Sequence, residues 1–198
     1  MKVLWAKFHE LHRYLINIWT LIGSELVRET VLIIGGCRSG KSGHALHLAE
    51  QLAGQKIFIA TCVPGDKEME QRVLHHQKQR NTKRKTLEVP LLLSESIREN
   101  SGRGHVILVD CLTLWINNLI MENDDPENID MHIQQLIQSL EKTECPVILV
   151  SNEVGTGIVP ENRLARLFRD VAGFANQKIA ACVDRVIWMV AGIPVEIK

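Results

Sequence analysis

Residues 31–52 constrain the fold of this chain more than any other stretch, because a strand, a glycine-rich loop and a helix follow one another directly. The apolar run at 31–34 leads into GGCRSGKS at 35–42, which matches G-x-x-x-x-G-K-[ST], and apolar residues then recur at helical spacing. The alternative, a chance glycine-rich turn, would not require a strand before it and a helix after it. The stretch therefore predicts a phosphate-binding loop made of Gly35, Gly36, Cys37, Arg38, Ser39, Gly40, Lys41 and Ser42.

The chemistry of this loop comes from its backbone and from two side chains. Glycines let successive N–H groups and the following helix N-terminus surround an anion. Lys41 can reach the β- and γ-phosphates of a nucleotide, and Ser42 can ligate Mg²⁺. We therefore expect a nucleotide site that uses Mg²⁺.

Composition limits the number of domains and the classes of partner. The chain has 198 residues, 45% of them hydrophobic, and no long linker, which favours a single globular unit. Lys and Arg number 23, as do Asp and Glu, so the balance gives no reason to expect a nucleic-acid partner or an anionic membrane surface. The five cysteines are odd in number, widely spaced and without a CxxC pair, which argues against a disulfide framework or zinc site and favours a reducing cytoplasm.

Residues 1–30 are predicted to form an amphipathic helix outside the nucleotide-binding domain, which we expect at 31–198. The longest uncharged run, 14–24, is shorter than the roughly 20 apolar residues that cross a bilayer, so we expect no membrane span. Packing on the domain or on a neighbouring subunit is favoured over an interfacial membrane anchor, because the polar face includes Glu10 and Glu25. The apolar positions that recur at intervals of three and four are Leu4, Phe8, Leu11, Leu15, Trp19, Ile22 and Leu26.

Apolar strands and helices alternate after the loop, which predicts an α/β fold. Strands are expected at 56–60, 105–109, 146–150, 185–190 and 195–197. Helices are expected at 66–78, 112–121 and 131–140, and a long helix is expected to open at Pro160. The pattern indicates a mainly parallel sheet covered by helices on both faces, with the ligand at the carboxyl ends of the strands.

Polar residues follow the predicted strands at this edge: Lys41, Thr61, Asp110, Asn152 and Glu153. Asp110 is placed where P-loop enzymes carry a second carboxylate for magnesium, although it could instead, or in addition, cap the helix that begins near residue 112. Glu153 is a candidate base for a kinase reaction. A loop carboxylate that stabilises Arg163 or the next helix is an equally good interpretation of Glu153.

A pair of histidines lies in the predicted helix that follows the second strand. His75 and His76 point about 100° apart on a helix, so only one of them can face a given pocket. A basic cluster follows at 78–85. From composition alone this stretch is a solvated charged helix with surface histidines.

Several segments together resemble the bifunctional adenosylcobinamide kinase/adenosylcobinamide-phosphate guanylyltransferase family of cobalamin biosynthesis. They are GGCRSGKS, RVLHHQKQR, VDCLTLWINNL and, most specifically, SNEVGTGIVPENRLAR followed by FRDVAGFANQ. The resemblance covers residues 31–198 and leaves 1–30 outside. It implies a single P-loop domain of the RecA-like type.

The resemblance also implies the reactions and the residues that carry them. Family members phosphorylate adenosylcobinamide with ATP or GTP and then pass GMP from GTP, through a guanylyl-histidine, to the new phosphate with release of pyrophosphate. The second histidine of the pair, His76 here, corresponds to the guanylylated one. Beyond the phosphate loop, the guanine-nucleotide contacts correspond to Thr61, Cys62, Val63, Gln77, Lys78, Gln79, Arg80, Glu88 and Asp110.

One position departs from the family pattern, and the assembly is implied by resemblance alone. Gln77 stands where relatives often have lysine, which changes the charge available to phosphate beside His76. A homotrimer is implied.

Two other classes of protein fit parts of the sequence. A single-activity P-loop kinase of a small metabolite would leave His75 and His76 incidental. A non-enzymatic nucleotide-dependent switch could use residues 1–30 as a docking helix. A covalent guanylyl adduct would distinguish our interpretation from the first, and turnover of adenosylcobinamide would distinguish it from the second.

Overall fold

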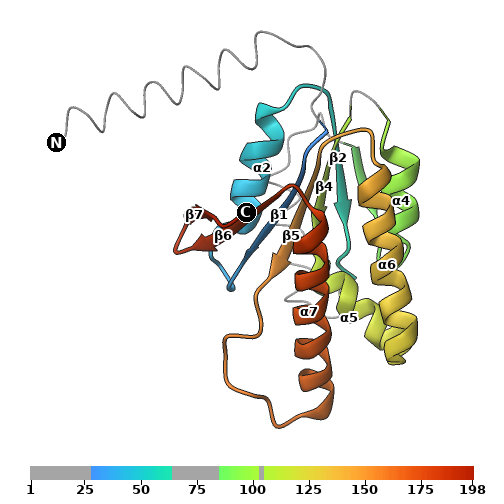
Figure 1. The fold of residues 1–198 in the computed structure, drawn as a ribbon, viewed down its shortest axis with the longest axis vertical. Coiled ribbons are helices and arrows are strands. Elements are labelled where there is room, and N and C mark those ends of the chain that lie inside the picture. Colours follow the sequence, from blue (N-terminus) through green and yellow to red (C-terminus); the bar gives the residue numbers. More distant parts are fainter. Residues whose placement is uncertain (1–27, 64–84, 103–104) are drawn as a thin grey trace, which may run out of the picture.

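A seven-stranded sheet forms the centre of the molecule (Figure 1). The structure is a computed structural model that describes residues 28–63, 85–102 and 105–198. Nearly all of the predicted N-terminal helix and the predicted helix at 66–78, with both histidines, therefore lie outside the described residues.

The strand order is β3-β2-β4-β5-β1-β6-β7, with parallel pairing throughout except between β6 and β7. The expectation of a mainly parallel sheet is confirmed. β1, which feeds the phosphate loop, lies between β5 and β6, so its backbone is paired on both sides. The strands are β1 (Thr30–Gly35), β2 (Gln55–Ala60), β3 (Lys85–Glu88), β4 (His105–Asp110), β5 (Val147–Asn152), β6 (Arg185–Val190) and β7 (Ile193–Glu196).

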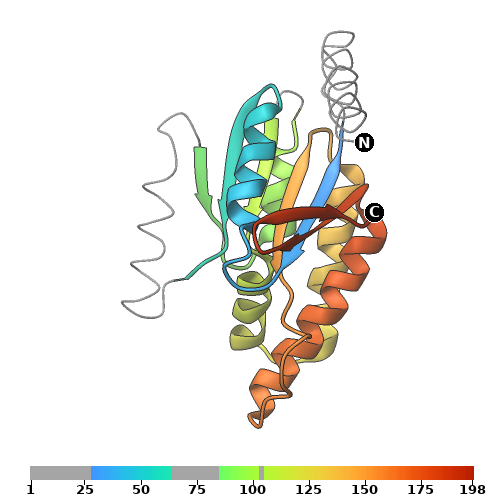
Figure 2. The same ribbon diagram turned by 90° about the vertical axis from the view of Figure 1, so that its left-hand side faces the viewer.

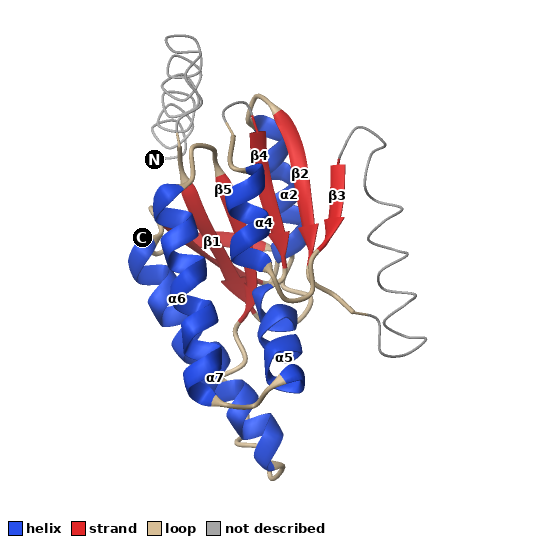
Figure 3. Ribbon diagram, turned by 90° about the vertical axis from the view of Figure 1, so that its right-hand side faces the viewer, coloured by secondary structure: helices blue, strands red, loops and turns tan. Residues whose placement is uncertain are grey.

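Helices cover both faces of the sheet, as predicted. Helix α2 lies on one face, and the other four described helices lie on the opposite face (Figures 2 and 3). The described helices are α2 (Lys41–Gln51), α4 (Leu93–Asn100), α5 (Leu112–Glu122), α6 (Pro126–Lys142) and α7 (Arg163–Cys182). No helix in the described ranges is long and apolar enough to cross a membrane.

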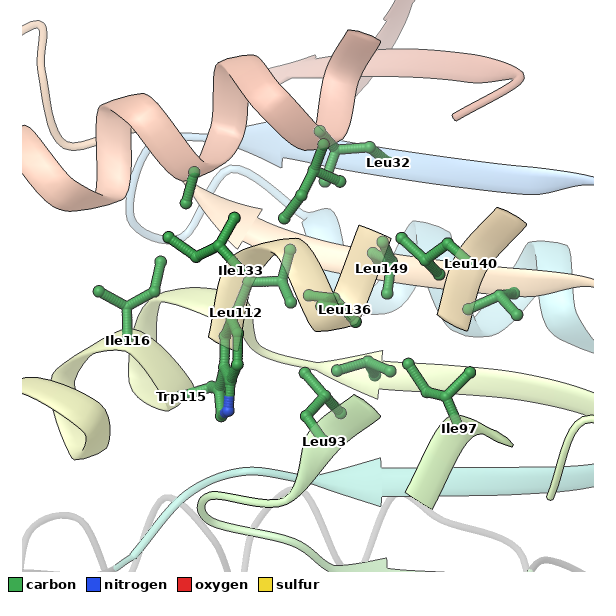
Figure 4. Packing of buried hydrophobic residues seen from close by; sticks show 14 of the residues in the cluster. Leu32, Leu93, Ile97, Leu112, Trp115, Ile116, Ile133, Leu136, Leu140 and Leu149 are labelled. Carbon is green, nitrogen blue, oxygen red and sulfur yellow. The ribbon is translucent and has the colours of Figure 1, made fainter. Parts of the chain in front are cut away.

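The core consists of two layers because alternate strand residues point to opposite faces. In β1, Leu32 packs into the layer shared with α4–α7, whereas Val31 and Ile33 pack toward α2. The larger layer is centred on Trp115 and Leu112 of α5 (Figure 4). Helix α5 is therefore fixed firmly against the sheet.

Several boundaries differ from the sequence predictions. The long helix does not open at Pro160, so that prediction was wrong: α7 begins at Arg163, because the Asn162 side chain caps it by accepting from the backbone N–H of Ala165 at 3.1 Å. Helix α6 begins at Pro126, five residues before the predicted start, with Asp125 as its N-cap. Strand β3 and helix α4 were not predicted.

Residues just before β1 also belong to the packed domain. β1 begins at Thr30, whose backbone N–H and hydroxyl donate to the Asp184 carboxylate at 2.7 and 2.8 Å. Arg28 donates to the carbonyl oxygens of Leu140 and Glu141 at the end of α6. The packed domain thus starts no later than residue 28.

Candidate nucleotide site

The phosphate loop is formed where β1 meets α2. A Cβ on Gly35 would lie 2.5 Å from the carbonyl oxygen of Met189 in β6, so only glycine fits there. Gly40, at the N-cap of α2, has φ 95°, a left-handed conformation that favours glycine. Both glycines of the motif are therefore required by the backbone path, as the sequence pattern predicted.

Lys41 lies at the base of this loop and is only 7% exposed. Its Nζ donates to the Gly36 carbonyl oxygen at 2.6 Å and to Ser39 Oγ at 3.4 Å. Burial lowers the pKa of Lys41, while Cys111, Cys37 and Asp110 oppose that shift. A desolvated ammonium held by its own loop gives a strong electrostatic partner for phosphate, because removal from water strengthens the attraction.

Ser42 and Asp110 are the predicted magnesium ligands, and the structure brings their segments together. Ser42 is in the first turn of α2, next to Lys41, and the Asp110 charge acts on Lys41. A hydroxyl and a carboxylate are oxygen ligands of the kind Mg²⁺ prefers, and nucleotide phosphates usually complete its shell. The residues present fit a magnesium–nucleotide complex.

Thr61 follows β2 and is completely buried. Its hydroxyl donates to the Cys111 carbonyl oxygen at 2.7 Å and accepts from the Cys111 N–H at 3.0 Å, and its own N–H donates to the Asp110 carbonyl oxygen at 3.3 Å. The polar groups of Thr61 are thus engaged in joining the ends of β2 and β4. The more exposed Cys62 and Val63 come next in the chain.

Glu88 ends β3, directly opposite Ala60 of β2, while Ala60 is also opposite Asp110 of β4. Glu88 and Asp110, two of the predicted nucleotide contacts, therefore lie at the same level of the sheet on the two strands that flank β2. The remaining predicted contacts lie outside the described residues: His76, Gln77, Lys78, Gln79 and Arg80.

Asn152 and Glu153 lie beside the phosphate loop. Asn152 is the register partner of Gly35, and the Glu153 N–H donates to the Gly35 carbonyl oxygen at 2.9 Å. The Glu153 Oε1 accepts from the Gly155 N–H at 2.7 Å. The backbone of Glu153 therefore lies beside the phosphate loop, while its carboxylate stabilises its own loop.

Sequence reasoning missed a set of polar contacts that runs along the carboxyl edge of the sheet. Asn152 Nδ2 donates to Thr113 Oγ1 at 2.9 Å, and Thr113 Oγ1 contacts Cys111 Sγ at 3.2 Å. On α7, Asn176 accepts from Ser151 Oγ at 2.7 Å. Polar residues at the buried positions of helices were the available sign, since such groups are normally hydrogen-bonded.

Cys111 is part of this set but is not a reactive thiol. Burial, with a further contribution from Asp110, raises the pKa of Cys111 to about 11. The thiolate is the reactive form, so Cys111 is chemically inert near neutral pH. Its backbone, rather than its sulfur, orders the site.

Comparisons with known proteins agree on one family. A family model described as cobinamide kinase/cobinamide phosphate guanyltransferase matches residues 31–197. The bifunctional adenosylcobalamin biosynthesis protein CobP of Pseudomonas aeruginosa is 42% identical over 167 residues, which are 84% of this chain and 96% of that protein. The corresponding protein CobU of Salmonella typhimurium is 42% identical over 180 residues, covering 85% and 99%.

Among solved structures, a KaiC-like protein of Pyrococcus horikoshii has a TM-score of 0.44 at 13% identity, covering 81% of this chain and 70% of that one. A similarity this low supports no argument about function. The phosphate loop and the strand order define the fold directly.

Proposed function

The chain belongs to the cobinamide kinase/cobinamide phosphate guanyltransferase family, and we propose on that basis that one nucleotide site at the carboxyl edge of its sheet carries both reactions. The protein is a bifunctional kinase and guanylyltransferase of cobalamin biosynthesis. The observation that carries the single-site proposal is the phosphate loop, with a desolvated Lys41 at its base and Asp110 nearby. A loop of this kind can hold the triphosphate whether the α- or the γ-phosphorus is attacked.

In the kinase reaction, the aminopropanol hydroxyl of adenosylcobinamide attacks the γ-phosphorus of ATP or GTP. A bond forms between the hydroxyl oxygen and phosphorus, the β–γ anhydride bond breaks so that ADP or GDP leaves, and the hydroxyl proton passes to a base, for which Glu153 is the candidate. Lys41 and the loop N–H groups position the triphosphate and stabilise the charge that develops on it. Mg²⁺ held by Ser42 and Asp110 would neutralise part of the phosphate charge.

In the guanylyltransferase reaction, we propose His76 as the nucleophile. A neutral imidazole nitrogen attacks the α-phosphorus of GTP, the α–β anhydride bond breaks, and pyrophosphate leaves. The phosphate oxygen of adenosylcobinamide phosphate then attacks the same phosphorus, which gives adenosylcobinamide-GDP and restores the imidazole. Formation of a covalent intermediate lets one site serve two acceptors in turn.

The nucleotide contacts proposed for this site combine the phosphate loop with three neighbouring strand ends. Cys62 and Val63 follow the buried Thr61, whose hydroxyl is hydrogen-bonded to the backbone of Cys111 directly after β4. The position at which this segment leaves β2 is therefore fixed. Glu88 and Asp110 end the strands on either side of β2. Residues 77–80 complete the proposed set by resemblance.

The assembly and the compartment are also proposals. We expect a homotrimer by resemblance, in which a neighbouring subunit can complete each site. A cytoplasmic location is supported by the five cysteines, all within the described ranges and none in a disulfide. Analytical ultracentrifugation would measure the mass of the assembly.

The single-site proposal is tested by replacing Lys41 with alanine. We expect both half-reactions to fall on the order of a hundredfold or more, because both need the same cation at the phosphates. The exposed Lys142, in the last turn of α6, gives a matched control, and Lys142→Ala should keep both activities. A wild-type rate for either half-reaction in Lys41→Ala would show that the two reactions use different sites.

A further inference from the structure

Asn118 of α5 connects two of the strand ends that border the proposed nucleotide site. Its Nδ2 donates to the Thr61 carbonyl oxygen at 2.7 Å and to the Pro90 carbonyl oxygen at 3.0 Å. Thr61 follows β2 and Pro90 follows β3, so a single amide group bridges the segments that leave two adjacent strands. Nothing in the chemistry of phosphate transfer requires such a bridge.

Helix α5 supplies further links to the same edge of the sheet. Trp115, one turn before Asn118, donates through Nε1 to the Leu91 carbonyl oxygen at 2.8 Å. The helix itself begins at Leu112, two residues after Asp110 of β4. Since the apolar face of α5 packs into the core, the helix is a fixed support that holds the ends of β2, β3 and β4.

We propose that Asn118 is a positioning residue for the nucleoside side of the nucleotide site, as distinct from its phosphate side. The assignment rests on the proposed function, because it assumes that residues 61–63 and Glu88 contact the guanine nucleotide. Asn118 touches none of the reacting atoms and acts through the backbone of the segments that it holds. Both hydrogen bonds of the Asn118 amide reach segments that follow β2 and β3, whereas the phosphate loop is built on β1 and α2.

The amide is chemically specific for this task. A side-chain NH₂ group offers two donors, which match the two carbonyl acceptors. A carboxylate has nearly the same shape but offers only acceptors, so Asn118→Asp would place negatively charged oxygens against two carbonyl oxygens. Loss of the bridge should let the segments after β2 and β3 separate.

Asn117 provides a matched control, since it is the adjacent residue of the same helix and is exposed. The experiment compares Asn118→Asp with Asn117→Asp in the full chain, using GDP and inorganic pyrophosphate as separate probes in calorimetric titrations. Pyrophosphate reports on the phosphate loop alone, whereas GDP also needs the nucleoside contacts. We expect Asn118→Asp to weaken GDP binding by about tenfold relative to Asn117→Asp, because the two lost hydrogen bonds act on the nucleotide only indirectly, through the segments they hold. Pyrophosphate binding should be unchanged.

Equal GDP affinities in the two variants would overturn the assignment. So would a parallel loss of GDP and pyrophosphate binding in Asn118→Asp, because general structural damage would affect both probes. If Asn118→Asp fails to fold, Asn118→Gln and Asn118→Leu replace it. Tighter GDP binding by Asn118→Gln than by Asn118→Leu supports the assignment, and equal GDP binding by the two variants overturns it. Wild-type protein that bound neither probe would overturn the proposed function as well, whereas normal wild-type binding with indistinguishable variants overturns only the role of Asn118.

Discussion

Alanine at position 35 tests whether the end of β1 must pass directly against β6 to form the phosphate loop. A Cβ at Gly35 would lie 2.5 Å from the Met189 carbonyl oxygen and 2.8 Å from Ser39 Oγ. Ser39 could rotate, but Met189 contributes backbone and is the register partner of Gly35 in the parallel ladder. The strand ends must therefore separate, which moves the loop.

The size of the effect follows from this overlap. Forcing an extra carbon into a packed region costs about 1–3 kcal/mol. For a chain of this length, a loss of about 2 kcal/mol lowers Tm by roughly 4–8 °C. Because the displaced segment is the loop itself, we also expect Gly35→Ala to lose most of its affinity for pyrophosphate.

Gly36→Ala is the control, since a Cβ at this neighbouring glycine meets nothing within 4 Å. Thermal unfolding followed by circular dichroism, and pyrophosphate titration, are measured for both variants. We expect Gly36→Ala to unfold close to the wild-type temperature. If Gly35→Ala unfolded at the same temperature as Gly36→Ala and bound pyrophosphate as tightly as wild type, the close approach of β1 and β6 would not be what shapes the loop.

Two other predictions concern the border of the domain. The backbone N–H of Thr30 holds the pKa of Asp184 below its usual range, so the stabilisation is present above the unfolded-state pKa, near 4, and is lost as pH falls through the folded-state value. Asp184→Asn should therefore lower the free energy of unfolding by about 1 kcal/mol at pH 7, a figure reduced because the carboxylate is exposed. In urea unfolding, the difference between variant and wild type should shrink below about pH 4. A difference that does not change with pH would contradict this prediction. Deleting residues 1–27 should leave a folded, active protein. Deleting residues 1–30 should lower Tm, because this deletion removes the contacts of Arg28 and Thr30. Equal stability of the two truncated proteins would show that these contacts are dispensable.

Elements with a strong local pattern could be predicted from the sequence. The phosphate loop and the apolar strands were predicted because each is encoded within a few adjacent residues. Strand β3 was missed since it has four residues, three of them exposed, and therefore no apolar run. Helix α4 was missed because only eight residues form it and two of its four buried positions are serines.

The supporting part of the site could not be predicted for a different reason. Asn118 and Thr61 are 57 positions apart, and their hydrogen bond exists only because the sheet brings β2 beside α5. A pattern in the sequence shows that Asn118 is polar on an apolar helix but not which carbonyl oxygen it reaches. Such contacts depend on the tertiary fold and are found only in the structure.

The most direct test of the two-reaction account is the identity of the histidine that carries GMP. GTP labelled at the α-phosphate is incubated with wild type, His75→Ala and His76→Ala, and the acid-labile adduct is located by peptide mapping. We predict an adduct at His76 in wild type and in His75→Ala, and no adduct in His76→Ala. The His76→Ala variant should nevertheless retain part of its kinase activity, because γ-phosphoryl transfer to a hydroxyl needs no nucleophilic histidine. An adduct that persists in His76→Ala and disappears in His75→Ala would contradict the account.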